Sequence, residues 1–341
     1  MSDAPEIRLS PGPGPGPGPG LHLREADLWL DPRRPQHRAF VSHAHADHVA
    51  RHQRILCSPV TAHLLQTRYR IARERLCIQE FHECRNWQGF LCTLLPAGHI
   101  AGSAMLHIVD ETSGASLLYT GDYKLRSSRS IESASWKTAD TLIMESTFGL
   151  PRYVLPSASA IESQLCDFVK ESMAGAHTPI LLGYSLGKAQ EIAAILAAHH
   201  IPFVNTASVA QMTEACRAAG LALPAASAWH EEIPHGHALI APPQFLRHKD
   251  FSRIPRPRTA MLTGWALHPS ARFRYGVDAA IPLSDHADFP DLLRTAEIVQ
   301  PRRIITVHGS TRELAASLRA RNFNAWSHFG DDQLELFADF P

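Results

Sequence analysis

Three histidines and an aspartate lie within six positions of one another in the segment Ser42-His43-Ala44-His45-Ala46-Asp47-His48. This H-x-H-x-D-H pattern follows the apolar run 39–41, so we expect a short strand that ends in a loop of converging side chains. Neutral imidazoles and carboxylates are ligands of zinc and manganese, and the close spacing allows one loop to serve two adjacent ions. In a chain with 21 histidines the alternative is a histidine-rich surface loop, but the added aspartate favours a metal site.

A second candidate loop lies at residues 96–103, where glycines flank His99 before an apolar strand expected at 104–109. Glycine allows the backbone to approach a neighbour closely, and His99 is the natural next ligand. On its own, His99 would be read as a structural or surface histidine. Earlier in the chain, Asp31 ends the apolar segment 28–30 before a proline and is expected to be a cap or a support for the ligands.

Carboxylates also end two successive apolar strands. Asp122 follows the segment 117–120, where a ligand between two metals is expected, and Glu145 follows the segment 141–144. The pattern therefore predicts that two neighbouring strands deliver acids to one edge of a sheet.

The composition limits the class of protein. A chain of 341 residues with 45% hydrophobic residues is long enough for about two globular domains. Basic and acidic residues number 33 each, so no strong field attracts a polyanion. The sequence has neither a membrane-spanning apolar run nor a signal-peptide pattern, so we expect a cytoplasmic protein with no membrane partner. The six cysteines form no C-x-x-C pair, which predicts reduced thiols.

The middle of the chain changes to strands alternating with amphipathic helices, which predicts a parallel sheet covered on both faces. Its turn Gly183-Tyr-Ser-Leu-Gly187-Lys188 lacks the P-loop spacing and has Ala189 in the Ser/Thr position, so nucleotide binding there is rejected. A Pro-Gly repeat at residues 10–20 is expected to form a loop or tail.

Histidines with neighbouring acids return near the C-terminus. His286 lies in the segment Ser284-Asp-His-Ala-Asp288, ahead of a helix expected at 290–299. His308 follows the β-branched strand 303–307. The candidate ligands thus bracket a central segment that has none, as expected for one domain inserted into another.

Together these motifs resemble the metallo-β-lactamase superfamily, and specifically its β-CASP nucleases. The elements that favour the β-CASP branch are Glu145-Ser-Thr-Phe-Gly, Ser-Leu-Gly-Lys-Ala-Gln-Glu, Ser-Asp-His286 and Val-His308-Gly. The resemblance implies an α/β fold, a metallo-β-lactamase αββα sandwich formed by residues 1–155 and 278–341. A Rossmann-like β-CASP insert of residues 156–277 would interrupt it, with a substrate cleft where the domains meet.

The resemblance also implies a site with two divalent ions, zinc first and manganese as the alternative. His43, His45 and His99 would bind one ion, and Asp47, His48 and His308 the other, with Asp122 shared and Asp31 in support. The ions would activate water and stabilise charge on a scissile phosphate.

Three residues would carry the catalytic work by this resemblance. Asp47 would orient the attacking water, and His286 would protonate the leaving oxygen while Glu145 steers it. A helix-capping role is the alternative for His286. Ser146 and Thr147 are further candidates, for phosphate binding.

Within the branch, Leu30-Asp-Pro-Arg-Arg34 and Thr263-Gly-Trp-Ala266 resemble bacterial exonucleases that accompany ATP-dependent DNA ligases. We therefore expect a DNA exonuclease in repair that acts from the 5′ end, with a ligase or a helicase as functional partner. An RNA-processing β-CASP ribonuclease is the alternative, because the ligands do not report the 2′-hydroxyl. A small ester or thioester hydrolase and a non-enzymatic scaffold rank behind it.

Overall fold

The computed structural model describes residues 9–11, 20–225, 227–230 and 232–328. The chain forms two compact units. The first comprises the described residues up to Ser127, Glu132–Tyr153 and those from His286 onward, and the second comprises Ser128–Ile131 and Val154–Asp285. Among the helices of these described residues, none combines the length and hydropathy that a bilayer crossing requires.

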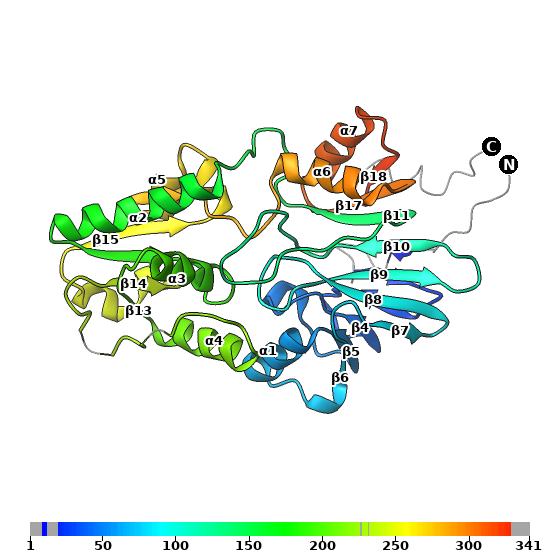
Figure 1. The fold of residues 1–341 in the computed structure, drawn as a ribbon, viewed down its shortest axis with the longest axis horizontal. Helices are drawn as coiled ribbons and strands as arrows, with labels where there is room; N and C mark the ends of the chain where they lie inside the picture. The colour runs from blue at the N-terminus through cyan, green and yellow to red at the C-terminus, as the bar shows by residue number, and fades with distance from the viewer. Residues whose placement is uncertain (1–8, 12–19, 226, 231, 329–341) are drawn as a thin grey trace. The chain divides into compact units, whose positions relative to one another are not determined.

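The first unit is built on two sheets (Figure 1). One sheet follows chain order: β1 (Leu9–Pro11), β2 (Leu21–Leu23), β3 (Leu28–Leu30), β4 (Arg38–Phe40), β5 (Arg54–Cys57) and β6 (Leu76–Ile78). The other runs in the order β18 (Ala325–Ser327), β17 (Arg303–Gly309), β11 (Thr141–Ser146), β10 (Ser116–Tyr119), β9 (Ala104–Asp110), β8 (Phe90–Pro96) and β7 (Cys84–Trp87).

Apolar side chains from both sheets form one core. Phe40 and Leu56 of the first sheet pack in the same cluster as Leu106, Ile143 and Val307 of the second. Successive residues of a strand point to opposite faces, so these strands use every second side chain for this core. The two sheets therefore pack face to face.

The opposite face of the second sheet is covered by α6 (Phe289–Val299) and α7 (Thr311–Arg319), which lie beside β17 and β18 (Figure 1). Leu292 of α6 and Leu314 of α7 share a buried cluster with Leu142 and Ile304 of the sheet. These helices give the second sheet a second apolar core. The first sheet contacts α1 (Pro59–Tyr69) at β6.

The second unit has one parallel sheet, in the order β13 (Phe203–Asn205), β14 (Ala238–Ala241), β12 (Thr178–Leu182), β15 (Pro257–Leu262) and β16 (Ala279–Ile281). Its helices are α2 (Ala158–Ala174), α3 (Lys188–Ala198), α4 (Ala207–Ala218) and α5 (Ala271–Tyr275). Its short 3-10 helices are η3 (Pro243–Arg247), η4 (Lys249–Arg253) and η5 (Gly264–Leu267). The first unit contains the 3-10 helices η1 (Ala46–His48) and η2 (Arg73–Arg75).

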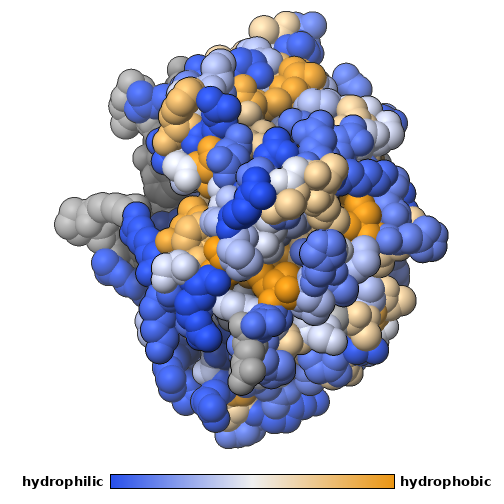
Figure 2. Space-filling view, turned by 90° about the vertical axis from the view of Figure 1, so that its left-hand side faces the viewer, coloured by the Kyte–Doolittle hydropathy of each residue, from blue (hydrophilic) through white to orange (hydrophobic). Residues whose placement is uncertain are grey.

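Both faces of this sheet are buried, as the alternation of strands and helices predicts. Leu181 lies in one cluster with residues of α2 and α3, whereas its neighbours Ile180 and Leu182 lie in another with Phe245. Outside these clusters, hydrophobic residues are interspersed with hydrophilic ones on the face seen in Figure 2.

Two segments differ from the sequence-based expectation. Residues 12–19 of the expected Pro-Gly loop lie outside the described residues, but Ser10 and Pro11 belong to β1 and pair with β2. Pro11 is compatible with a strand there because β1 is at the edge of its sheet. Residues 279–281, which the sequence division assigns to the first domain, form β16 and pair with β15 of the second unit.

Candidate metal centre

The predicted ligand loop begins just after β4. It continues through His43 and His45 into the 3-10 turn η1. The ring of His43 is fully buried, with its centroid 4.8 Å from that of His45 and 4.1 Å from that of His48. The short loop therefore gathers its histidines around His43.

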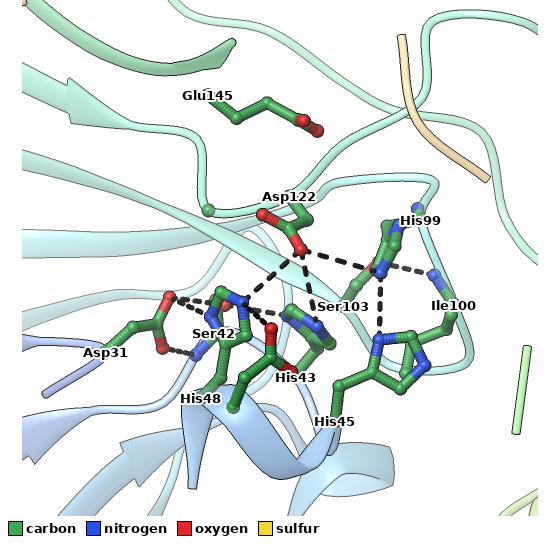
Figure 3. A network of polar contacts seen from close by, with 12 residues as sticks. Asp31, Ser42, His43, His45, His48, His99, Ile100, Ser103, Asp122 and Glu145 are labelled. Carbon is green, nitrogen blue, oxygen red and sulfur yellow. Dashed lines mark hydrogen bonds and ion pairs between the residues drawn. The ribbon is translucent and has the colours of Figure 1, made fainter. Parts of the chain in front are cut away.

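His99 reaches the same place from the loop between β8 and β9. Its ring centroid lies 4.6 Å from that of His43, and its Nε2 lies 3.2 Å from Nδ1 of His45 (Figure 3). One nitrogen from each of these histidines lies within 4.8 Å of the others, so the three can share one ion.

Asp122 lies at the centre of the site (Figure 3). Its Oδ2 is 3.3 Å from Nε2 of His48, 3.8 Å from Nε2 of His43 and 3.9 Å from Nε2 of His99. The preceding Gly121 allows this approach, because a Cβ there would lie 2.7 Å from Cβ of Ser42. Asp122 therefore lies within 4 Å of a nitrogen of each of these three histidines.

Asp31 holds the ligand loop in place through hydrogen bonds to Ser42. Its Oδ1 accepts a hydrogen bond from Ser42 N at 2.7 Å, and its Oδ2 accepts one from Ser42 Oγ at 2.6 Å. The same Oδ2 accepts a bond from the Tyr119 hydroxyl at 2.9 Å and lies 3.1 Å from Nδ1 of His48. This buried carboxylate therefore contacts two neighbouring parts of the loop, at Ser42 and at His48.

The hydrogen bonds around Ser42 define the state of His43. The Ser42 hydroxyl donates to Asp31, so at 2.9 Å from His43 its oxygen accepts the Nδ1 proton. The other nitrogen, Nε2, is buried and has no hydrogen-bond partner among the described residues. An unprotonated, buried Nε2 aimed at Asp122 is the arrangement that a metal ligand requires, so the residues fit a metal ion.

The pKa values of the ligands differ by position. Burial, together with the neighbouring His48, His99 and His45, holds the pKa of His43 well below its usual value. Burial alone would also lower the pKa of His48, but the carboxylates of Asp122 and Asp31 outweigh it and raise that pKa well above 6.5. In the metal-free protein, burial therefore favours the neutral form of His43, whereas the two carboxylates favour the protonated form of His48.

Asp47 and His308 are gathered less closely. The Asp47 side chain is 65% exposed, and its Oδ2 lies 3.7 Å from Nε2 of His48. The ring centroid of His308 lies 6.0 Å from that of His48. Neither residue belongs to the groups of potential ligands that lie within 4.8 Å of one another in the described chain.

The buried Glu145 and the half-buried His286 form a pair beside the candidate ligands. His286 Nδ1 lies 2.9 Å from Oε2 of the fully buried Glu145, which also accepts bonds from Tyr123 N at 2.7 Å and Thr147 Oγ1 at 2.5 Å. Glu145, His286 and Asp122 also place one potential ligand atom each within 4.8 Å of one another. A carboxylate held by these two other donors fixes the orientation of the imidazole.

The two candidate phosphate-binding residues have other partners. The Ser146 hydroxyl is bonded to the carbonyl oxygens of Val307 and His308, where the pairing of β11 with β17 shifts register. The Thr147 hydroxyl donates to Glu145. In the structure, therefore, the Ser146 hydroxyl takes part in strand pairing and the Thr147 hydroxyl orients Glu145.

Several supporting residues escaped the sequence analysis. Arg68 Nη1 and the Tyr69 hydroxyl donate to the carbonyl oxygen of Ala44 at 3.0 and 3.2 Å. At the other end of α1, Ser58 and Thr61 donate to the carbonyl oxygen of Gly102 at 2.6 and 2.8 Å. Helix α1 therefore holds both histidine loops. An N-cap serine before a proline signals the start of the helix but not these contacts.

Comparisons with known proteins agree with a metal centre. The family model described as "Zn-dependent metallo-hydrolase RNA specificity domain" matches residues 274–326. A "Probable DNA ligase" from Opitutus terrae is 43% identical over 316 residues, which make up 93% of this chain and 31% of that protein. The chain thus spans about a third of the length of this relative.

Other relatives are nucleases by name. An "RNase J-like protein" from Methanocaldococcus jannaschii is 30% identical over 179 residues, 46% of this chain and 42% of its own. "Endoribonuclease YSH1" from Eremothecium gossypii is 34% identical over 125 residues, 36% of this chain and 16% of its own. A crystal structure of a protein of unknown function from Enterococcus faecalis shares the fold, with a TM-score of 0.57 at 14% identity over 86% of this chain and 79% of that one.

Proposed function

Because the chain belongs to the Zn-dependent metallo-hydrolases and is homologous to β-CASP nucleases, we propose that it is a two-metal phosphodiesterase that degrades DNA from the 5′ end. The mixed α/β fold predicted from the sequence is confirmed and is consistent with the metallo-β-lactamase and β-CASP fold. The match to a Zn-dependent metallo-hydrolase family and the His/Asp groups that could hold metal ions support the divalent ions of this proposal. The reaction is hydrolysis of a phosphodiester in a nucleic acid strand.

One observation carries the proposal. Asp122 belongs both to a group of potential ligands with His43 and His48 and to a group with Glu145 and His286. Asp122, a potential metal ligand, therefore lies beside His286, whose Nδ1 is hydrogen-bonded to the buried Glu145. Phosphodiester hydrolysis needs both features, because negative charge grows on the phosphate while the leaving oxygen needs a proton.

The residues have distinct tasks in this reaction. When bound by the predicted ligands, divalent ions supply an activated water and screen the phosphate charge. Asp47, the exposed carboxylate next to His48, orients the water. His286 donates its proton to the oxygen that leaves as the P–O bond breaks, and Glu145 stabilises the protonated ring and aims it. General acid catalysis of this kind contributes roughly 10²–10⁴-fold.

The choice of DNA is supported by the relative from Opitutus terrae. Nearly the whole chain aligns with part of a protein named "Probable DNA ligase". A nuclease attached to a ligase fits the trimming of DNA ends before they are joined. We propose on this basis that the chain acts together with an ATP-dependent DNA ligase.

The experiment measures degradation of 5′-labelled and 3′-labelled single-stranded DNA and RNA of one sequence by the purified protein with zinc or manganese. We expect short products from DNA, with the label position giving the polarity. An Asp47→Ala/His48→Ala variant should be inactive, whereas His37→Ala, which removes an exposed histidine outside the site, should keep full activity. If the wild-type protein, like the Asp47→Ala/His48→Ala variant, cleaves none of these substrates, the proposed function is overturned.

RNA is the second candidate substrate, and a specific observation favours it. The family model that matches residues 274–326 is described as an RNA specificity domain, and two relatives are ribonucleases by name. The same assay separates the two, because faster cleavage of RNA than of the matched DNA would overturn the DNA assignment while the two-metal chemistry stands.

A further inference from the structure

The motif Ser185-Leu-Gly-Lys-Ala-Gln-Glu191 has no role in the metal centre, although the sequence singles it out. It forms the start of α3, where Gly187 turns the chain with a φ of 95°. Gln190 closes this turn by accepting from Gly187 N at 2.7 Å and donating to Ser185 O at 3.0 Å and to Thr213 Oγ1 at 2.9 Å. The turn is therefore held rigidly by its own side chains.

Lys188, the first residue of α3, is buried in this turn. Its side chain is 4% exposed, and its stem packs over Gly183, where a Cβ would lie 2.8 Å from Cγ of the lysine. Its Nζ donates to Asp285 Oδ1 at 2.6 Å and to the carbonyl oxygen of Leu283 at 3.1 Å. A buried ammonium with two such acceptors ties the segment 283–285 to the helix.

That segment leads directly to His286. On the other side of the histidine, Ala287 N donates to the carbonyl oxygen of Tyr123 at 2.8 Å, and Asp288 is paired with Arg126 while it caps α6. The residues on both sides of His286 in the chain are therefore held by hydrogen bonds or ion pairs. The ion pair of Lys188 with Asp285 is the side-chain anchor immediately before it.

We propose that Lys188 is a positioning residue for the nuclease reaction: through Asp285 it fixes the backbone that carries His286, so that the imidazole stays aligned with Glu145 and the leaving oxygen. This inference rests on the proposed function, in which His286 protonates that oxygen. Small displacements of a catalytic group are costly, because proton transfer requires alignment at hydrogen-bond distance.

The test compares two substrates that differ only in their need for a proton. One is a DNA oligonucleotide, and the other is the same DNA with sulfur in place of the bridging oxygen that leaves, since a thiolate departs without protonation. We expect Lys188→Met to lower kcat on the oxygen substrate by about tenfold or more with an unchanged KM, and to leave the sulfur substrate within about twofold of wild type. His286→Ala should show the same selectivity more strongly, and adding Lys188→Met to it should cause no further loss.

Two variants separate positioning from stability. Lys188→Met leaves the half-buried charge of Asp285 without its lysine, whereas Lys188→Met/Asp285→Leu removes both charges. This double variant should restore the melting temperature but not the rate on the oxygen substrate. If Lys188→Met alone fails to fold, this double variant carries the comparison. Gln190→Ala loosens the same turn without contacting residues 283–285 and should lower both rates equally.

The outcomes distinguish the two proposals. Equal losses of the lysine variants on both substrates, or recovery of the oxygen substrate in the double variant, would overturn the role of Lys188. If the wild type cleaves neither substrate, the proposed function itself fails.

Discussion

The predicted ligands form two sets that share Asp122. One set is His43, His45 and His99, and the other is Asp47, His48 and His308. The first three rings are in mutual contact, and their nitrogens lie within 4.8 Å of one another. The second set is spread out, with a largely exposed aspartate and a ring centroid distance of 6.0 Å from His48 to His308. Under the proposed two-metal site, we therefore expect the first set to be preformed and the second to be completed when the cation binds.

The protonation of His43 differs from that of His48. His43 is kept neutral by burial and by its histidine neighbours, whereas His48 is kept protonated by Asp31 and Asp122. A neutral imidazole binds a cation at once, but a protonated one must first release its proton. We therefore expect the first set to bind zinc more tightly than the second.

The largest effect should come from the residue shared by both sets. Asp122→Asn removes the negative charge that lies within 4 Å of three histidine nitrogens. The binding of both metal ions should therefore be weaker. We expect nuclease activity to fall by on the order of 10³-fold or more. Zinc content by plasma emission spectroscopy should drop with it, while His37→Ala retains the wild-type content.

A pair of variants should separate the two sets. In a zinc titration by calorimetry, wild type should show a tight phase and a weaker one. His43→Gln should abolish the tight phase, whereas Asp47→Asn should weaken the second phase by about 10–100-fold and spare the first. The comparison fails if Asp47→Asn weakens the tight phase as much as His43→Gln does.

The sequence reveals the site residues that are close together in the chain more fully than those that are far apart in it. The loop from His43 to His48 is legible because its ligands are adjacent on one turn, and strand ends predict that Asp122 and Glu145 point to one edge. The pairing of Glu145 with His286 joins residues that are 141 positions apart, and only the family resemblance suggested it. Spacing alone carries no information on such a contact.

The supporting contacts could not be predicted for a physical reason. The hydroxyl of Ser42, like that of Tyr119, becomes informative only when the packed sheets place it beside Asp31. The end of α1 could not be predicted either. The helix ends at Tyr69 and is followed by Arg70, which adopts a left-handed conformation with a φ of 55° although it is not a glycine. Hydroxyl partners and such turns depend on tertiary structure that local patterns do not contain.

The pH dependence of zinc binding should also differ between the sets. The pKa of His48 is raised above 6.5 in the folded, metal-free protein, so a proton leaves as the second ion binds. The affinity of the second phase should rise by about tenfold per pH unit until the pH exceeds the pKa of His48, while the first phase changes little above pH 6.5. Calorimetry in buffers of different ionisation enthalpy measures the released proton.

The same shift affects the stability of the metal-free protein. A raised pKa means that the folded state holds the proton more tightly than the unfolded state does. The stabilisation by protonated His48 is complete below pH 6.5 and is lost as the pH rises through the raised pKa. His48→Asn should abolish both the loss of stability with rising pH and the release of a proton on zinc binding. If either effect persists in that variant, another group is responsible for it.

The smallest effect should come from Ser42→Ala, which tests the support of the first set alone. Without the hydroxyl, His43 loses the partner that fixes its Nδ1 proton, and Asp31 loses one donor. We expect the tight phase to weaken by about tenfold, as for other residues that orient a metal ligand. Ser172→Ala, which removes a buried hydroxyl bonded to Phe168 O in the second unit, is the matched control and should leave zinc binding unchanged. An unaltered tight phase in Ser42→Ala would mean that burial alone holds His43 ready, since the ring would keep its neutral state without a fixed tautomer.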